Sequence, residues 1–153
     1  MDLRHISSAV VWVDFFTIVL HKVFNLGRSL DVWYSKFGIV AVISDCLVIV
    51  LGILLAQFFT PRNVLLGSIG IQLLHDYLFY LLVILQVPLG QNSMIDLFKS
   101  YAKENSWKIL LADSAMIGST VVLAEHLTQY RDQIVNFVGL LGVYALTYII
   151  YTK

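Results

Sequence analysis

The chain has 153 residues, of which 59% are hydrophobic and 13% are charged, against roughly 45–50% and 25% in ordinary soluble domains. Ten Lys and Arg residues balance ten Asp and Glu residues. The protein therefore lacks the positive field that binding to nucleic acid requires. A single cysteine, Cys46, excludes an intrachain disulfide and a cluster of thiolate ligands. This composition favours a membrane protein.

Five apolar stretches predict an all-α fold, a polytopic integral membrane helical bundle with five transmembrane helices. At about 1.5 Å per residue, about 20 residues cross a hydrocarbon core of about 30 Å. The stretch 6–24 is the weakest candidate because Asp14 divides its apolar run, and a bundle of four spans is the fallback. The predicted spans lie in a single transmembrane domain, 1–153, at 6–24, 37–59, 64–87, 109–127 and 134–151.

Two shorter stretches between the spans have amphipathic patterns. Residues 93–105 predict a helix in the membrane interface, because apolar side chains recur there at helical spacing while charged ones fall on the opposite face. A weaker stripe of the same kind consists of Leu26, Leu30, Trp33 and Phe37. The favoured interpretation is a linker that rests its apolar side on lipid. The alternative is a contact surface for a partner protein or the membrane, made of Met94, Phe98, Lys99, Tyr101 and Lys103.

The basic residues predict the orientation of the five spans. Seven of them share one side, whereas three share the other. Because positive residues are enriched in cytoplasmic loops, the larger group is expected in the cytoplasm and the N-terminus outside. The cytoplasmic group is Lys22, Arg28, Lys36, Lys99, Lys103, Lys108 and Lys153, and the external group is Arg4, Arg62 and Arg131.

Four aspartates lie inside the predicted spans: Asp14, Asp45, Asp76 and Asp113. An Asp at the centre of a spanning helix costs about 2.5–3.5 kcal/mol, so these side chains must be paired, protonated or hydrated. Counting the helical rise from the predicted membrane boundaries places the last three in one layer. The predicted intramembrane polar cluster comprises Asp45, His75, Asp76, Asp113 and Ser114.

Two interpretations of this polar cluster stay open. It can be a network that ties helices together, which is the favoured interpretation, or a site that holds a proton or a cation. No motif with fixed ligand spacing predicts a metal site, and we expect no cofactor. Ser114 has neither a nucleophile elbow nor a helix-borne base near it, so we expect no enzyme activity.

Three strings, HDYLFY (75–80), GQNSMIDLFKSYAKE (90–104) and ILLADSAMI (109–117), resemble small multi-pass membrane proteins of nucleocytoplasmic large DNA viruses, the giant viruses. The resemblance covers residues 37–153. It implies a protein of the virion internal membrane, derived from host endomembrane, which lies under an icosahedral capsid with its charged face toward the shell.

Two functions follow as expectations. The first is a structural membrane protein that organises the bilayer or anchors capsid proteins through its cytoplasmic segments. The alternative is a small proton or cation channel or transporter that uses the intramembrane aspartates. In both cases the partners we expect are the lipid bilayer, capsid or other membrane proteins, and further copies of the chain in an oligomer.

Overall fold

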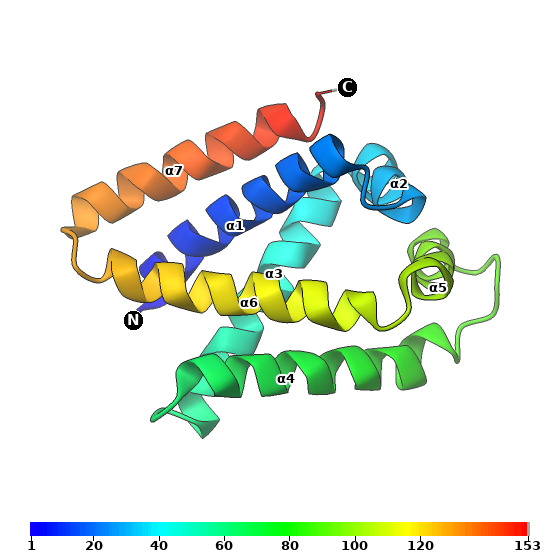
Figure 1. The fold of residues 1–153 in the computed structure, drawn as a ribbon, viewed down its shortest axis with the longest axis horizontal. Helices are drawn as coiled ribbons and strands as arrows, with labels where there is room; N and C mark the ends of the chain where they lie inside the picture. The colour runs from blue at the N-terminus through cyan, green and yellow to red at the C-terminus, as the bar shows by residue number, and fades with distance from the viewer. Residues whose placement is uncertain (153) are drawn as a thin grey trace.

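The computed structural model describes residues 1–152, and these residues form a helical fold without strands (Figure 1). The prediction of an all-α protein is confirmed. In chain order the elements are α1 (Leu3–Phe24), α2 (Arg28–Phe37), α3 (Ile39–Phe59), α4 (Val64–Phe79), the π-helical turn η1 (Tyr80–Ile84), α5 (Ser93–Asn105), α6 (Lys108–Leu127) and α7 (Asp132–Ile149).

Five helical segments are long and apolar enough to cross a membrane, which confirms the predicted number of long apolar helices. The segment predicted at 6–24 is a continuous helix of 22 residues and is one of these five. The span predicted at 64–87 is helical only as far as Ile84 and ends ahead of Pro88, which has no amide proton to continue a helix. The five segments are α1, α3, α4 with η1, α6 and α7.

Short polar side chains begin several of these helices. The Asp2 carboxylate accepts hydrogen bonds from the backbone amides of Arg4 and His5, and Asn92 caps α5 in the same way. Such caps satisfy amides that have no partner inside the helix. The helix predicted at 93–105 is α5, with the same bounds.

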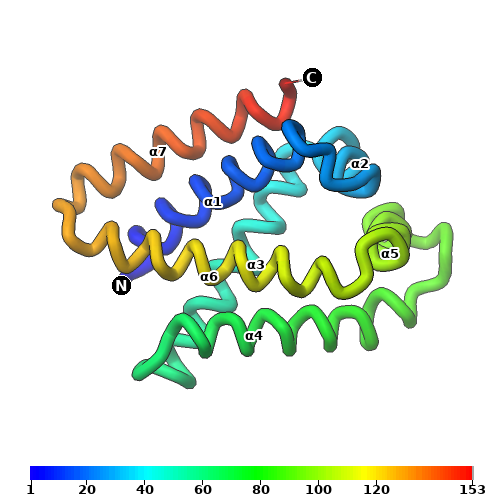
Figure 2. The backbone as a smooth tube through the Cα atoms, in the orientation of Figure 1, coloured from blue at the N-terminus to red at the C-terminus, as the bar shows by residue number. Residues whose placement is uncertain are grey.

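Helix α1 occupies the centre of the bundle and packs against α3, α6 and α7. It is the most buried of the five long apolar helices. Helix α4 packs against α3 and α6, and α3 crosses obliquely behind α6 (Figure 1). The backbone tube shows the N-terminus at one end of the bundle, and α2, α5 and the C-terminal region at the other (Figure 2).

The interior contains two groups of buried apolar side chains. The first core cluster lies between α1, α3, α6 and α7 and includes Ile6, Ile53, Ile117 and Val135. The second core cluster lies at the α2 end and includes Ile18, Trp33, Tyr34, Val42 and Leu146. Large apolar side chains also point outward from all five long helices, among them Phe16, Leu51, Leu74, Leu111 and Leu140. An apolar exterior of this kind suits contact with lipid tails.

Helices α1 and α7 pack closely because α7 carries glycine at the contact. Ser8 donates a hydrogen bond from Oγ to the backbone oxygen of Val135 at 3.0 Å, and Trp12 donates from Nε1 to that of Val138 at 3.0 Å. A Cβ atom on Gly142 would lie 2.7 Å from a methyl carbon of Val11. The first and the last long helix are therefore joined by a contact with no room for a larger residue.

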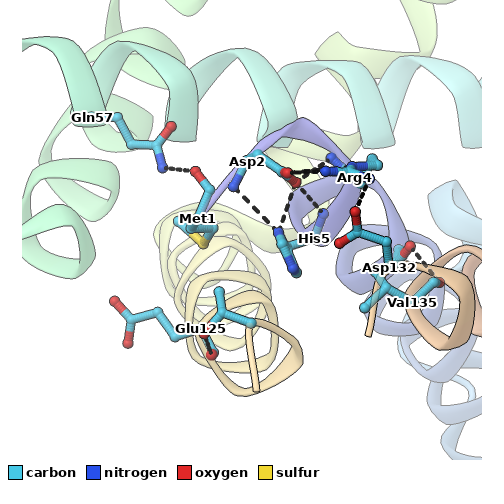
Figure 3. Close-up of polar contacts among 10 residues, drawn as sticks. Met1, Asp2, Arg4, His5, Gln57, Glu125, Asp132 and Val135 are labelled. Carbon is cyan, nitrogen blue, oxygen red and sulfur yellow. Dashed lines mark hydrogen bonds and ion pairs between the residues drawn. The ribbon is translucent and has the colours of Figure 1, made fainter. Parts of the chain in front are cut away.

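A polar network fixes the start of α1 against two other helices (Figure 3). Arg4 bridges Asp2 and Asp132 at the start of α7, and Gln57 of α3 donates a hydrogen bond to the backbone oxygen of Met1 at 2.9 Å. The Arg4 guanidinium is the main cause that lowers the pKa of Asp2 to about 2. The N-terminal end of the bundle is thus held by charged and polar contacts.

Candidate functional site

The site lies at the end of the bundle that α2 and α5 cover. Two glycines with positive φ, Gly27 at 151° and Gly38 at 51°, stand on either side of α2. Glycine adopts such angles without a steric penalty. The chain can therefore leave α1, run across the end of the bundle as α2 and turn again into α3 (Figure 1).

Asp45, on α3, accepts two hydrogen bonds from α2. Its Oδ2 atom lies 3.0 Å from Nε1 of Trp33 and 3.3 Å from the hydroxyl oxygen of Tyr34, and both donors are almost fully buried. Burial, with the nearby carboxylates of Asp45 and Asp14, holds the pKa of Tyr34 well above its ordinary value. Tyr34 therefore keeps its proton and remains a donor to Asp45.

Asp14 is a fully buried carboxyl group at the middle of α1. Its Oδ2 atom lies 4.0 Å from the Cys46 sulfur of α3, and its Oδ1 atom has no hydrogen-bond partner. Asp45 is near enough to act on it electrostatically. Sequence analysis placed Asp14 inside a span but left it out of the predicted cluster. The structure places it beside Asp45.

Asp76 and Asp113 lie on α4 and α6, which pack against each other. Asp113 is in electrostatic range of Asp76, Asp45 and His75. Asp76 also accepts a hydrogen bond at Oδ1 from Nε2 of Gln72 at 2.8 Å, and Nδ1 of His75 lies 3.1 Å from the same atom. The structure thus brings together four of the predicted residues. With Asp14 they form the acidic cluster: Asp14, Asp45, His75, Asp76 and Asp113.

Helix α5 closes over this cluster with its apolar side. The Phe98 ring contacts those of Trp33 and Phe79, with centroid distances of 5.0 Å and 5.9 Å, and Met94 packs on the second core cluster. Burial and the charges of Asp113 and Asp45 raise the pKa of Tyr101. The apolar side of α5 therefore lies on the protein itself, whereas sequence analysis favoured a linker that rests on lipid.

The two lysines of the predicted contact surface differ in their surroundings. Lys99 donates a hydrogen bond from Nζ to the backbone oxygen of Val87, whereas Lys103 is exposed. Met94, Phe98 and Tyr101 are each partly buried. Of the five residues predicted to form a partner or membrane contact, Lys103 alone is fully available at the surface.

Glu104, at the end of α5, caps the start of α2. Its two carboxylate oxygens accept from the backbone amides of Arg28 at 2.8 Å and Ser29 at 3.0 Å. Hydrogen bonds from Ser29 are the main cause that lowers the pKa of Glu104. A carboxylate at a helix N-terminus also interacts favourably with the helix dipole. We call the joined helices α2 and α5 the α2–α5 cap.

Ser114 forms no side-chain hydrogen bond with the acidic cluster within the described residues. It lines a shallow surface groove together with Leu65, Gly118, Ser119 and His126. Trp33 and Tyr34, in contrast, belong to the site, although neither was part of the predicted cluster. Their buried N–H and O–H groups need acceptors, and Asp45, inside the next predicted span, was the signal that could have revealed the contact.

The cluster combines several carboxyl groups with few compensating charges. In the part of the chain that the structure describes, no Lys or Arg forms an ion pair with any of its four aspartates. Nor do residues 1–152 contain a group of three or more His, Cys, Asp or Glu side chains that could hold a metal ion. Carboxyl groups in this setting can form hydrogen bonds between helices or exchange protons.

No protein-family model, curated protein or solved structure matches the chain. The chemistry of the acidic cluster is therefore interpreted from its own geometry. Two features decide that interpretation. The aspartates of the cluster lie on α1, α3, α4 and α6, and the α2–α5 cap lies at one end of the bundle (Figure 1).

Proposed function

We propose that the chain is a multi-pass integral membrane protein with a structural role, which anchors other proteins at the membrane surface through the α2–α5 cap. The five long apolar helices and their outward-facing Leu and Phe side chains support residence in a bilayer. The acidic cluster acts in this proposal as an internal network that fixes the cap to the bundle.

The distribution of basic residues supports an orientation with the cap in the cytoplasm. Six Lys and Arg residues of the described chain belong to the cap end and three to the opposite end; Lys153, the seventh predicted there, lies outside the described residues. The six are Lys22, Arg28, Lys36, Lys99, Lys103 and Lys108, and the three are Arg4, Arg62 and Arg131.

The fixed geometry of the α2–α5 cap is the observation that carries the anchoring proposal. Glu104 and the contact of Trp33 with Phe98 join its two helices, and the hydrogen bond from Trp33 joins the cap to Asp45. A surface that is already ordered loses little conformational entropy when a partner binds. Lys103 and Trp107 are exposed at this end and provide a positive and an aromatic contact.

The resemblance to giant-virus membrane proteins supports a virion internal membrane as the site of action. In such a membrane the cap would face the capsid shell, and the N-terminal end would face the enclosed lumen. The charged residues at the cap end suit contact with a protein layer. Detection of the chain in purified particles, in the lipid fraction that remains after the capsid is removed, would place it there.

Cysteine labelling in sealed vesicles tests the proposed topology. A cysteine at Asn92, in the cap-side loop, and one at Asn63, in the α3–α4 turn, should react with a membrane-impermeant reagent from opposite sides, with Asn92 cytoplasmic. The native Cys46 is replaced by Ala in both variants. Labelling of both positions from the same side would contradict the five-span arrangement.

Photo-crosslinking in the intact membrane tests anchoring. A photoreactive amino acid at Lys103 should form a crosslink to a protein of the overlying layer. The same group at Leu140, which is 71% exposed on α7, should react with lipid. Exclusive reaction with lipid at Lys103 as well would argue against an anchoring role.

The alternative function, a proton or cation path, is favoured by a different observation. Buried oxygen atoms of Asp14 and Asp76 have no partner, whereas a purely structural network would satisfy its members. Wild-type protein in reconstituted vesicles would then conduct protons or cations, and Asp76→Asn would abolish the flux. Glu125→Gln, which changes an exposed carboxyl outside the cluster, should leave the flux unchanged. Wild-type vesicles without flux would reject this alternative.

A further inference from the structure

Helix α4 carries a row of polar side chains along its buried face. Within residues 1–152, six buried side-chain nitrogen or oxygen atoms have no hydrogen-bond partner, and three of them belong to Ser68, Gln72 and Asp76. These residues follow one another at intervals of four, so they share one face of the helix and extend over about 12 Å of its length. We call Ser68, Gln72 and Asp76 the α4 polar row.

The Ser68 hydroxyl differs from several other hydroxyls in the long helices. Thr17, Ser44 and Thr120 each donate to the backbone oxygen of the residue four positions earlier, which is how a helix commonly satisfies such a group. Ser68 is fully buried but makes no bond of this kind. Its hydroxyl is therefore available to a partner outside its own helix.

One hydrogen bond fixes the direction of the Gln72 side chain. Nε2 donates to Oδ1 of Asp76 at 2.8 Å, and Gln72 is 4% exposed. Its Oε1 atom lies toward α3, where a Cβ atom on Gly52 would be 3.9 Å away. Because Gly52 has no side chain, α3 brings no side-chain donor to Oε1 from this position. The oxygen is a buried acceptor without a donor, which is costly in an apolar interior.

The chemistry of the α4 polar row suits water. Oε1 of Gln72 and Oδ2 of Asp76 need donors, whereas the Ser68 hydroxyl can donate or accept. A water molecule can donate and accept at once, and buried water typically makes about three hydrogen bonds to groups of this kind. No Lys or Arg in the described part of the chain forms an ion pair with Asp76, so no fixed cation supplies the missing positive charge.

His75 links one end of the row to the surface. Its side chain is 44% exposed, and Nδ1 lies 3.1 Å from Oδ1 of Asp76. Asp76 is mostly buried, and Gln72 and Ser68 are buried. An imidazole in contact with lipid tails near the middle of a long helix would be costly. This position therefore favours a hydrated surface, from which water can reach Asp76.

We propose that the α4 polar row binds a row of water molecules, which hydrogen-bond to Ser68, Gln72 and Asp76. The bound water continues the acidic cluster along α4 toward the opposite end of the bundle. The inference deepens the second proposed function, on which its role in transport rests, because it names the route that a proton path would follow. Binding of water is an equilibrium property and does not require flux.

Solid-state magnetic resonance of the full chain in deuterated lipid bilayers tests the bound water. At short mixing times, magnetisation from water protons should reach the side chains of Ser68 and Gln72. Ile6 is also fully buried but lies in the first core cluster, so it is the internal control and should receive several-fold less. Equally slow transfer to all three side chains would show that the row is dry and would overturn the proposal.

Two substitutions of fully buried hydroxyls form a matched pair. Ser68→Ala removes a water-binding group and should lower the transfer to Gln72 several-fold. Thr120→Val removes a hydroxyl that already donates to the backbone oxygen of Met116, and should leave the transfer unchanged. Equal effects of the two variants would contradict the proposal. The wild-type measurement remains decisive if either variant fails to fold.

Sodium is the competing occupant, because carboxylate and amide oxygens also suit a hard cation. Exchange of choline for sodium in the buffer should leave the transfer unchanged, and its loss on adding sodium would assign the row to that ion. Vesicles without flux would reject the transport function but not the bound water. Flux combined with a dry row would reject this route and leave the transport function standing.

Discussion

At the scale of single residues, Asp45 shows how a carboxylate is accommodated inside an apolar bundle. It receives hydrogen bonds from Trp33 and Tyr34, which are themselves buried and need acceptors. The three side chains therefore satisfy one another. Because the donors belong to α2 and the acceptor to α3, the contact also determines where α2 lies.

The first prediction concerns the two donors to Asp45. Asp45→Ala leaves both without an acceptor and should lower the free energy of unfolding by about 1–3 kcal/mol. Asp45→Asn retains a side-chain oxygen and should cost less. Unfolding by denaturing detergent, followed by circular dichroism, measures the difference. Equal stability of wild type and the Ala variant would show that these hydrogen bonds contribute nothing.

Sequence analysis identified the aspartates inside the long apolar helices but not all of their partners. Charged residues stand out against apolar neighbours because their cost in lipid is large. Trp33 and Tyr34 do not, since the same residue types gather at membrane boundaries. Ser114 is the opposite case, because it was predicted as part of the cluster but lines a groove at the surface. It is adjacent to Asp113 in sequence, but successive residues of a helix point in different directions.

At the scale of elements, the bounds of α5 were predictable but the surface it contacts was not. Asn92 as the cap and the spacing of apolar residues predict a helix at 93–105. The pattern specifies an apolar side without saying what it touches. Lipid tails and the interior of a membrane protein are similarly apolar, so the contact of Phe98 with Trp33 emerged only from the fold.

The second prediction concerns Glu104 and the integrity of the α2–α5 cap. Glu104→Ala removes the acceptor for the amides of Arg28 and Ser29, so these amides should exchange hydrogen faster. Glu104→Gln keeps an oxygen acceptor without charge and should have a smaller effect. Hydrogen exchange measured by mass spectrometry over residues 26–34 reports both. Unchanged exchange in the Ala variant would exclude capping by Glu104.

The same contact should depend on pH in a defined direction. The pKa of Glu104 is lowered in the folded protein, so its ionised form stabilises the fold. This contribution is complete above the ordinary carboxyl pKa and disappears as pH falls through the lowered value. Exchange in the 26–34 segment of wild type should therefore rise relative to Glu104→Gln on acidification, and a constant ratio would contradict the linkage.

At the scale of the whole molecule, the least certain span in the sequence is the central helix of the structure. Asp14 interrupts the apolar run of α1 and weakens its membrane signal. Yet the protein buries Asp14 completely, so lipid never meets it. Hydropathy measures the partition of an isolated helix between water and lipid, and cannot show that other helices surround it.

The third prediction concerns the packing of α1 on α7. Gly142→Ala places a Cβ atom 2.7 Å from Val11 and 3.0 Å from Nε1 of Trp12, and should cost about 1–3 kcal/mol of stability through overpacking. Gly70→Ala is the matched control, because nothing lies within 4 Å of its added Cβ. Thermal unfolding in one detergent compares them. Equal losses would show that the contact is not closely packed.

The central position of α1 has a consequence for how the protein is made. A ribosome delivers α1 first, but its packing partners α6 and α7 are the last long helices to emerge. Until these two helices are made, Asp14 and Ser8 lack many of the neighbours that bury them in the folded protein. A chain that stops before α6 would therefore present an incompletely buried acidic group on its first helix.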